Sequence, residues 1–173
     1  MARVRLLHKE EVAPEVREMF QKMEDKGFPI LNLYRVMAHC PQLGRSFLRL
    51  GNSILFKGTV PHDLRELAIL RVGHINQAKY EWTQHVTIAL RAGVSKKQID
   101  ALPDWENSGN FTVQERAVLR YTDEVTKDIR VKDDTFAAVR SFLNEEGVVE
   151  LTTTIGYYGM ICRILEALQV ELE

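Results

Sequence analysis

Arg65-Glu66-Leu67-Ala68-Ile69-Leu70-Arg71 is the stretch that decides the fold, and Tyr80-Glu81-Trp82-Thr83-Gln84-His85 follows it after eight residues. Glu81 and His85 stand four residues apart, so in a helix they share one face, with Cβ atoms about 5–6 Å apart. A carboxylate in that position orients an imidazole and raises its basicity. Glu66 reaches the same point if the two helices pack antiparallel. Glu66, Glu81 and His85 are therefore the candidate catalytic residues.

Helical spacing of apolar residues continues through the rest of the chain, whereas period-two alternation is absent and β-branched runs are short. We therefore predict an all-α fold with about eight helices and short connections. Residues 73–78 are expected to form a looser bend, and residues 103–110 a polar loop. Helical segments are expected over residues 14–26, 30–38, 41–56, 59–72, 79–92, 95–102, 112–127, 132–143 and 148–170.

The ends of the predicted helices carry residues typical of caps. Thr59 is the expected N-cap of its helix. Ser95 with Gln98, and Thr112 with Glu115, have the spacing of capping boxes. Glycines are expected to end or break helices at positions 27, 58, 93 and 147.

The last predicted helix, residues 148–170, is apolar on nearly every face. A helix of this kind is expected at the centre of a fold or in an interface between subunits. Arg163 interrupts it. Its side chain either reaches the surface along apolar neighbours or supplies a counter-charge for an anionic substrate.

Composition limits the function classes. A chain of 173 residues with 45% hydrophobic and 27% charged residues is typical of one soluble globular domain, which we place at residues 1–173. The net charge is −1 and no basic run is present, so we do not expect nucleic-acid binding. No apolar run reaches 18 residues and no signal-peptide pattern opens the chain, so we expect a cytoplasmic protein without a membrane partner.

The two cysteines, Cys40 and Cys162, lie 122 positions apart and form neither a CxxC pair nor a metal-ligand cluster. We expect both to be reduced and mostly buried. The spacing of Glu66, Glu81 and His85, without a second histidine pair, is weak support for a metal site. No metal and no cofactor are therefore expected.

The two opening stretches resemble the carboxymuconolactone decarboxylase family, which shares an all-helical fold with the small alkylhydroperoxidases. The peroxidase branch carries Glu, eleven residues, Cys, two residues, Cys, three residues, His. On this chain the first and last positions fall on Glu66 and His85, and the two cysteine positions fall on Ala78 and Glu81. The resemblance covers roughly residues 40–125. It implies an AhpD-like helical bundle from a branch that lacks the CxxC.

The resemblance also implies a function, a lyase acting on a small organic acid or lactone. Loss of carbon dioxide leaves electron density in the lactone carbonyl, and a positioned acid then protonates carbon. In this interpretation His85 delivers the proton, Glu81 orients it and Glu66 relays it. The candidate substrate-binding residues are Tyr34, Trp82 and Arg163. For Tyr34 the alternative is a core residue with a hydrogen-bonded hydroxyl.

Two other functions stay open. An alkylhydroperoxidase or peroxiredoxin-type antioxidant activity is disfavoured, because Ala78 and Glu81 supply neither the reactive nor the resolving thiol that peroxide reduction needs. A non-catalytic small-molecule binder that has kept the fold is the other alternative. From the resemblance and the apolar last helix, we expect a homo-oligomer, either a trimer or a hexamer built from trimers.

Overall fold

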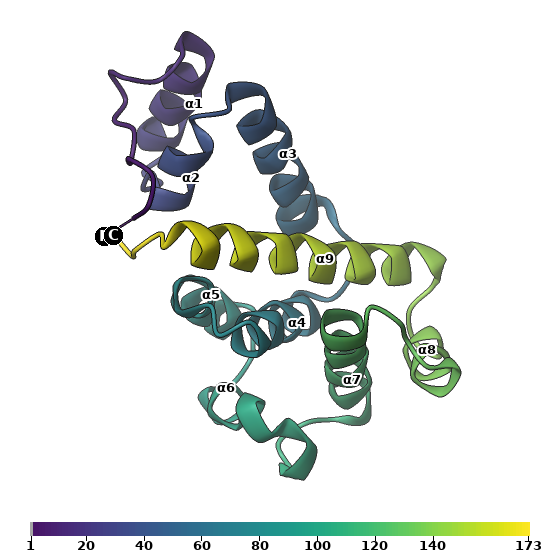
Figure 1. Cartoon of the computed structure of the whole chain (residues 1–173). Helices are drawn as coiled ribbons and strands as arrows, with labels where there is room; N and C mark the ends of the chain where they lie inside the picture. The colour runs from purple at the N-terminus through teal and green to yellow at the C-terminus, as the bar shows by residue number, and fades with distance from the viewer. Residues whose placement is uncertain (1) are drawn as a thin grey trace. The chain divides into compact units, whose positions relative to one another are not determined.

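The computed structural model describes residues 2–173, and every regular element in that range is a helix (Figure 1). The all-α fold class predicted from the sequence is therefore confirmed. In chain order the elements are α1 (Pro14–Asp25), α2 (Asn32–Met37), α3 (Pro41–Lys57), α4 (His62–Ile75), α5 (Lys79–Arg91), α6 (Lys96–Ala101), the 3-10 helix η1 (Leu102–Asn107), α7 (Val113–Asp128), α8 (Asp133–Arg140) and α9 (Glu145–Leu168).

Both predicted capping boxes are confirmed. The side chain of Ser95 accepts a hydrogen bond from the backbone of Gln98, and that of Thr112 accepts one from the backbone of Glu115. In each pair the side chain of the second residue also accepts a hydrogen bond from the backbone of the first. Gly27 and Gly93 follow helices with φ angles of 75° and 103°, a left-handed conformation that glycine adopts without steric cost.

The prediction that Thr59 caps its helix is wrong. Helix α4 begins at His62, and its N-cap residue Pro61 makes no side-chain hydrogen bond. The backbone and hydroxyl of Thr59 instead donate to the carboxylate of Glu150 in α9, at 2.5 and 3.1 Å. A local N-cap motif has thus been replaced by a long-range contact, which a sequence pattern does not reveal.

Two glycines lie inside helices: Gly147, which the sequence predicts to break one, and Gly73, which opens the predicted bend 73–78. Gly147 is in the first turn of α9, where its amide donates to the side chain of Asn144 at 2.8 Å. Gly73 is in α4, which continues through the predicted bend to Ile75. One glycine costs a helix only about 1 kcal/mol, which packing and caps offset. Part of the predicted loop 103–110 likewise forms η1.

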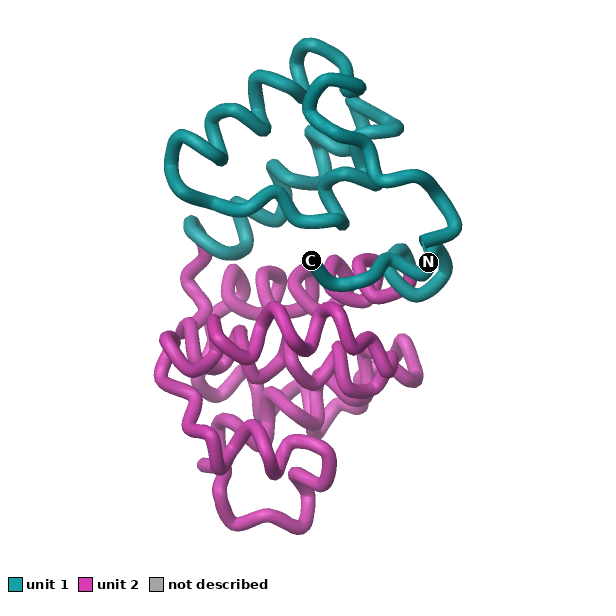
Figure 2. Tube along the Cα trace, turned by 90° about the vertical axis from the view of Figure 1, so that its left-hand side faces the viewer, with its two compact units in different colours: residues 1–57, 164–173 teal, residues 58–163 magenta. Residues whose placement is uncertain are grey.

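The chain divides into two compact units (Figure 2). One consists of the residues up to Lys57 together with Ile164–Glu173, and the other of Gly58–Arg163. The assignment of a single domain stays a prediction.

In the first unit a small apolar cluster holds the N-terminal segment against α1 and α2. Tyr34 is half-buried and packs on this cluster. Its buried members are Leu7, Val12, Val16, Phe20, Ile30 and Ala38.

In the second unit α4 is the most deeply buried element. Every residue from Leu64 to Gly73 is buried, and the helix packs mainly against α5 and α7. Helix α9, which the sequence predicts at the centre of the fold or in an interface between subunits, leaves Val149 and Met160 exposed. The core cluster under α4 consists of Leu67, Leu70, Ala89, Val94, Ile99, Leu102, Trp105, Phe111 and Leu119.

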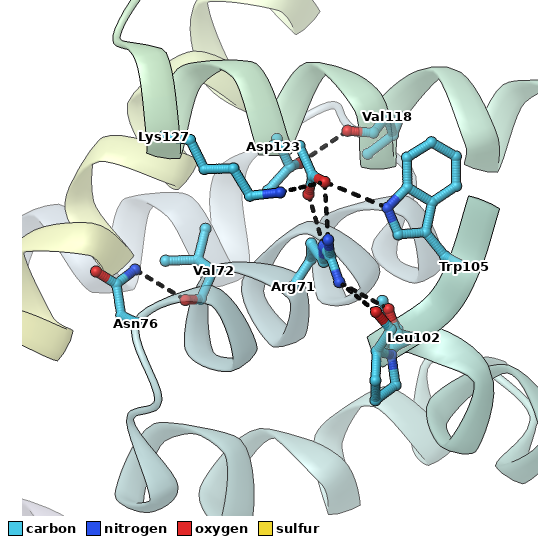
Figure 3. A network of polar contacts seen from close by, with 10 residues as sticks. Arg71, Val72, Asn76, Leu102, Trp105, Val118, Asp123 and Lys127 are labelled. Atoms are coloured by element: carbon cyan, nitrogen blue, oxygen red, sulfur yellow. Dashed lines mark hydrogen bonds and ion pairs between the residues drawn. The ribbon is translucent and has the colours of Figure 1, made fainter.

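One buried arginine joins three elements of this unit (Figure 3). Arg71 of α4 donates two hydrogen bonds to Asp123 of α7, at 2.6 and 2.8 Å, and one to the carbonyl of Leu102 at 2.9 Å. Burial raises the pKa of Asp123, but the hydrogen bonds from Arg71 and Lys127 outweigh it and hold that pKa below its ordinary value. The pair sets the packing of α7 on α4.

Across the described residues 2–173, no helix combines the length and the apolar character needed to cross a membrane.

Candidate active site

The candidate catalytic residues come from two helices that pack against each other, α4 and α5. Glu66 lies in α4 and is completely buried, with a relative exposure of 0%. Glu81 and His85 lie one turn apart in α5 and are exposed by 3% and 6%. Glu81 belongs to the first turn of α5, where a negative charge is favourable to the helix dipole.

The three side chains form one chain of hydrogen bonds, with His85 in the middle. Its Nδ1 lies 2.7 Å from Oε2 of Glu66, and its Nε2 lies 3.1 Å from Oε1 of Glu81. The structure therefore brings all three predicted catalytic residues together, and each ring nitrogen faces a carboxylate.

Sequence reasoning gave Arg65 no part in the site, yet it completes this group. Its Nε lies 3.3 Å from Oε1 of Glu66, and its side chain is only 5% exposed. Both partners of this ion pair are buried, so it belongs to the interior and not to the surface. Adjacent residues do not share a helix face, but the long guanidinium side chain reaches back to its neighbour.

Two opposing effects set the charge of His85. Burial by itself lowers the pKa of the imidazole, but the hydrogen bonds to Glu66 and Glu81 and the charges of these carboxylates outweigh it and raise the pKa of His85 to about 9. The ring is thus protonated at neutral pH and donates at both nitrogens. With Arg65, the group then holds two positive and two negative charges.

Helix α9 contributes an aromatic neighbour to the site. The rings of Tyr158 and His85 are 4.9 Å apart between centroids and almost perpendicular, at 85°. Tyr157 contacts Tyr158 in the same edge-on manner, at 5.4 Å. Both tyrosines are buried. No sequence pattern indicated the contact of Tyr158 with the histidine.

The three predicted substrate-binding residues lie in different surroundings. Trp82 is half-buried against the core cluster of the second unit, with its ring 6.1 Å from that of His74. Arg163 donates from Nη1 to the carbonyl of Gly159 at 2.7 Å. Tyr34 belongs to the other unit, where it lines a cavity of about 330 Å³ between α1, α2 and α3. Their role in binding a substrate stays a prediction.

Neither of the two cysteine positions of the peroxidase motif holds a thiol, because they are Ala78 and Glu81 in this chain. Ala78 is buried and is the N-cap residue of α5. Neither Cys40 nor Cys162 forms a disulfide. The expectation that both are buried holds for Cys162 only; Cys40 is exposed, because it stands in the short connection between α2 and α3.

No group of three or more His, Cys, Asp or Glu side chains suited to a metal ion is found in residues 2–173. In the Glu66–His85–Glu81 group each ring nitrogen already carries a hydrogen bond to a carboxylate. The arrangement suits the movement of protons along hydrogen bonds.

The part of the chain that contains the site matches a known protein family. The model of the carboxymuconolactone decarboxylase family matches residues 41–124, a segment that contains Glu66, Glu81 and His85.

Solved structures agree in fold. A protein of unknown function from Agrobacterium tumefaciens, proposed to be the antioxidant defence protein AhpD, is 27% identical, with a TM-score of 0.74 over 80% of this chain and 95% of that one. A peroxidase-related protein from Ralstonia eutropha JMP134 with an alkylhydroperoxidase AhpD core is 19% identical, with a TM-score of 0.87 over 99% and 92%.

A third structure is a variant of the debrominase Bmp8 in complex with 2,3,4-tribromopyrrole, which is 22% identical, with a TM-score of 0.82 over 100% of this chain and 94% of that one. At these identities the last two structures show a shared fold alone. The chain thus shares its fold with AhpD-like proteins, and its residues 41–124 match the carboxymuconolactone decarboxylase family.

Proposed function

We propose that this protein is an acid–base enzyme of the carboxymuconolactone decarboxylase type, which transfers a proton to a small organic acid or lactone as carbon dioxide leaves. The observation that carries the proposal is the buried hydrogen-bonded chain Glu66–His85–Glu81, with a protonated imidazole between two carboxylates. A buried acid with fixed partners is the arrangement that general acid catalysis uses.

The two carboxylates have different roles in this proposal. The bond from Nδ1 to Glu66 is the shorter, at 2.7 Å, and its acceptor is fully buried and held by Arg65. This bond orients the ring and persists during the reaction. The bond from Nε2 to Glu81 is longer, at 3.1 Å, and is the one through which the proton leaves. Compared with the interpretation from sequence, Glu66 and Glu81 exchange the orienting and relaying roles.

The reaction consumes one proton, which His85 supplies. The bond between the ring carbon and the leaving carboxylate of the substrate breaks, and its electron pair moves toward the lactone carbonyl while carbon dioxide departs. The Nε2 proton of His85 passes to Glu81, and the Glu81 carboxyl protonates the carbanionic carbon. His85 is left neutral, with its remaining proton on Nδ1 facing Glu66, and regains a proton from water.

The position of Glu81 supports this assignment. In the peroxidase branch the position that aligns with residue 81 is a cysteine, three residues after the other. A carboxylate at that point keeps a reactive group beside the histidine but replaces thiol chemistry with proton transfer. Bmp8, which shares the fold, was crystallised with 2,3,4-tribromopyrrole, which supports a small ring compound as the class of substrate.

The test measures carbon dioxide release from carboxymuconolactone and related unsaturated lactone acids, together with the melting temperature of each variant. His85→Gln and Glu81→Gln should lower turnover per folded molecule by about 10²–10⁴-fold. Glu124→Gln is the matched control: Glu124 is also buried, but accepts from Thr135 at 2.8 Å, so this variant should lose stability without losing turnover.

Two results would contradict the proposal. One is wild-type protein that releases no carbon dioxide from any of these lactone acids. The other is turnover per folded molecule that is unchanged in His85→Gln, with only a lower melting temperature, which would indicate a structural role for the histidine.

The peroxidase alternative leads to a separate prediction. Because the motif positions are Ala78 and Glu81, we expect no consumption of alkyl hydroperoxide with a dithiol as the electron donor. Hydroperoxide turnover that disappears in Cys40→Ser or Cys162→Ser would show that these thiols act outside the motif, and would revive the antioxidant function.

A further inference from the structure

The orientation of the His85 ring has one soft degree of freedom. A histidine ring turns about its Cβ–Cγ bond in a broad torsional well, unlike the sharp staggered wells of sp³–sp³ bonds. Because Nδ1 and Nε2 both lie off that bond axis, rotation carries both N–H groups out of line with their acceptors. Proton transfer from Nε2 to Glu81 depends on this alignment.

The two hydrogen bonds orient the ring but leave it some freedom to rotate. Hydrogen bonds tolerate deviations of some tens of degrees from linearity and weaken steeply only below about 120°. The longer bond, 3.1 Å to Glu81, is the more tolerant of the two. A packing contact on the ring narrows this range of angles.

Tyr158 makes such a contact. The directions of Nδ1 and Nε2 are occupied by Glu66 and Glu81, so Tyr158 meets the His85 ring elsewhere, at 4.9 Å and 85°. Tyr158 is itself 2% exposed and is backed by Tyr157, so it has little room to move aside. An aromatic ring packed edge-on resists rotation of its neighbour, because rotation would cause overlap or lose contact.

We propose that Tyr158 is a positioning residue for His85, whose aromatic ring holds the angle of the imidazole so that both N–H groups stay aligned with their carboxylates. The groups that face His85 come from three helices: Glu66, itself bonded to Arg65, from α4; Glu81 from α5; and Tyr158 from α9. The effect on catalysis rests on the proposed function, whereas the positioning itself does not.

The Tyr158 ring also affects the protonation of His85. The hydrogen bonds to Glu66 and Glu81 raise the pKa of His85, so a contact that keeps these bonds in line also favours the protonated form of His85. This effect depends on the shape of the Tyr158 ring and not on its phenolic hydroxyl. Tyr158→Phe should therefore behave as the wild type, while Tyr158→Leu should not.

The experiment is nuclear magnetic resonance of protein labelled with ¹⁵N-histidine, which reports both ring N–H groups and the pKa of His85 without any substrate. In Tyr158→Leu, exchange of these protons with water should be at least about tenfold faster, and the pKa of His85 should fall by about half to one pH unit. Tyr158→Phe should restore both. Tyr158→Met repeats the test with a second flexible side chain if the leucine variant does not fold.

The matched control is Tyr121→Leu. Tyr121 is also buried, at 3% exposure, but its hydroxyl pairs with Thr152 at 2.7 Å. This variant loses a buried aromatic ring without touching His85, so the histidine signals should not change. A comparable change in Tyr121→Leu would overturn the proposal, because it would trace the effect to general loss of stability.

Further outcomes test the positioning role of Tyr158 and the proposed function separately. Unchanged N–H exchange and pKa in Tyr158→Leu, or faster exchange in Tyr158→Phe, would overturn the role of the ring. So would wild-type spectra with two orientations of the His85 ring, which need no variant. If Tyr158→Leu alters these signals but leaves kcat for lactone decarboxylation unchanged, the positioning stands and the proposed function fails. A lower kcat with an unchanged KM supports both.

Discussion

The charge of His85 depends on residues that lie far apart in the sequence. One acceptor, Glu81, is four residues away in the same helix, while the other, Glu66, is 19 residues away in α4. Removing either partner would leave a buried group without its bond, which typically costs about 3–5 kcal/mol for a charged pair. The site is thus stable only when the members of the group are present together.

This protonation predicts how stability varies with pH. The pKa of His85 is about 9 in the folded state against 6.5 ordinarily, so the folded protein binds a proton more tightly than the unfolded chain. The stabilisation is fully present below about pH 6.5 and is lost as the pH rises through about 9. Urea unfolding should show a fall in the free energy of unfolding of up to about 3 kcal/mol across this window.

Urea unfolding of variants over the same pH range identifies which residue causes the fall in the free energy of unfolding. His85→Gln should remove most of it, whereas Glu124→Gln should retain it. A wild-type curve that is flat, or that rises, between pH 6.5 and 9 would contradict the protonated state of His85.

A second residue-scale prediction concerns three consecutive threonines of α9. Thr152 and Thr153 donate to the carbonyls of Val148 and Val149, each at 2.7 Å. Thr154 is 1% exposed, and its hydroxyl finds no hydrogen-bond partner within residues 2–173. Because an unpaired buried hydroxyl is costly, Thr154→Val should raise the free energy of unfolding by about 1 kcal/mol.

The control for this prediction is Thr122→Val. Thr122 is equally buried but donates to the carbonyl of Val118 at 2.7 Å, so its replacement should lower the melting temperature or leave it unchanged. A lower melting temperature for Thr154→Val would show that its hydroxyl has a partner after all.

At the scale of helices, a carboxylate from α9 holds the segment that leads into α4. Glu150 accepts from the backbones of Thr59 and Val60, at 2.5 and 3.2 Å. The same carboxylate lies where a side chain on Gly58 would be, because an added Cβ would overlap its Oε1. The start of α4, which carries Glu66, is therefore tied to α9, which carries Tyr158.

Because Glu150 fills this space, we predict that substitutions of Gly58 and Glu150 have coupled effects on stability. Gly58→Ala should displace the Glu150 side chain, and Glu150→Gln should weaken the same bonds, so each should lower the free energy of unfolding by about 1–3 kcal/mol. Since both act on one contact, the double variant should cost clearly less than the sum of the two. Additive losses in a double-mutant cycle measured by urea unfolding would exclude a shared cause.

At the scale of the whole molecule, several large apolar side chains reach the surface. In α3 these include Leu43 and Phe56, at 61% and 74% exposure, and in α9 Val149 at 66%. Exposed apolar groups of this size are unusual on a monomer when they are contiguous. They are consistent with the homo-oligomer expected from the sequence, which stays a prediction.

Light scattering at micromolar protein concentration checks this prediction. We expect a mass that is a multiple of 19.9 kDa, as a trimer or a hexamer. A mass of 19.9 kDa for the particle in solution would rule out a stable assembly.

The sequence by itself determined the all-α class, the approximate helix positions, both capping boxes and the facing of Glu81 and His85. These features are local: they depend on spacing within one helix or turn, which the peptide geometry sets.

Other features were decided only by the tertiary structure. They are the burial of Glu66 beside His85, the bond from Arg65, the ring of Tyr158 and the contact of Glu150 with Thr59. Each joins residues whose approach depends on how helices pack, except the Arg65 bond, whose strength depends on the burial that packing creates. The charge of His85 follows for the same reason, because burial and the second carboxylate exist only in the folded chain.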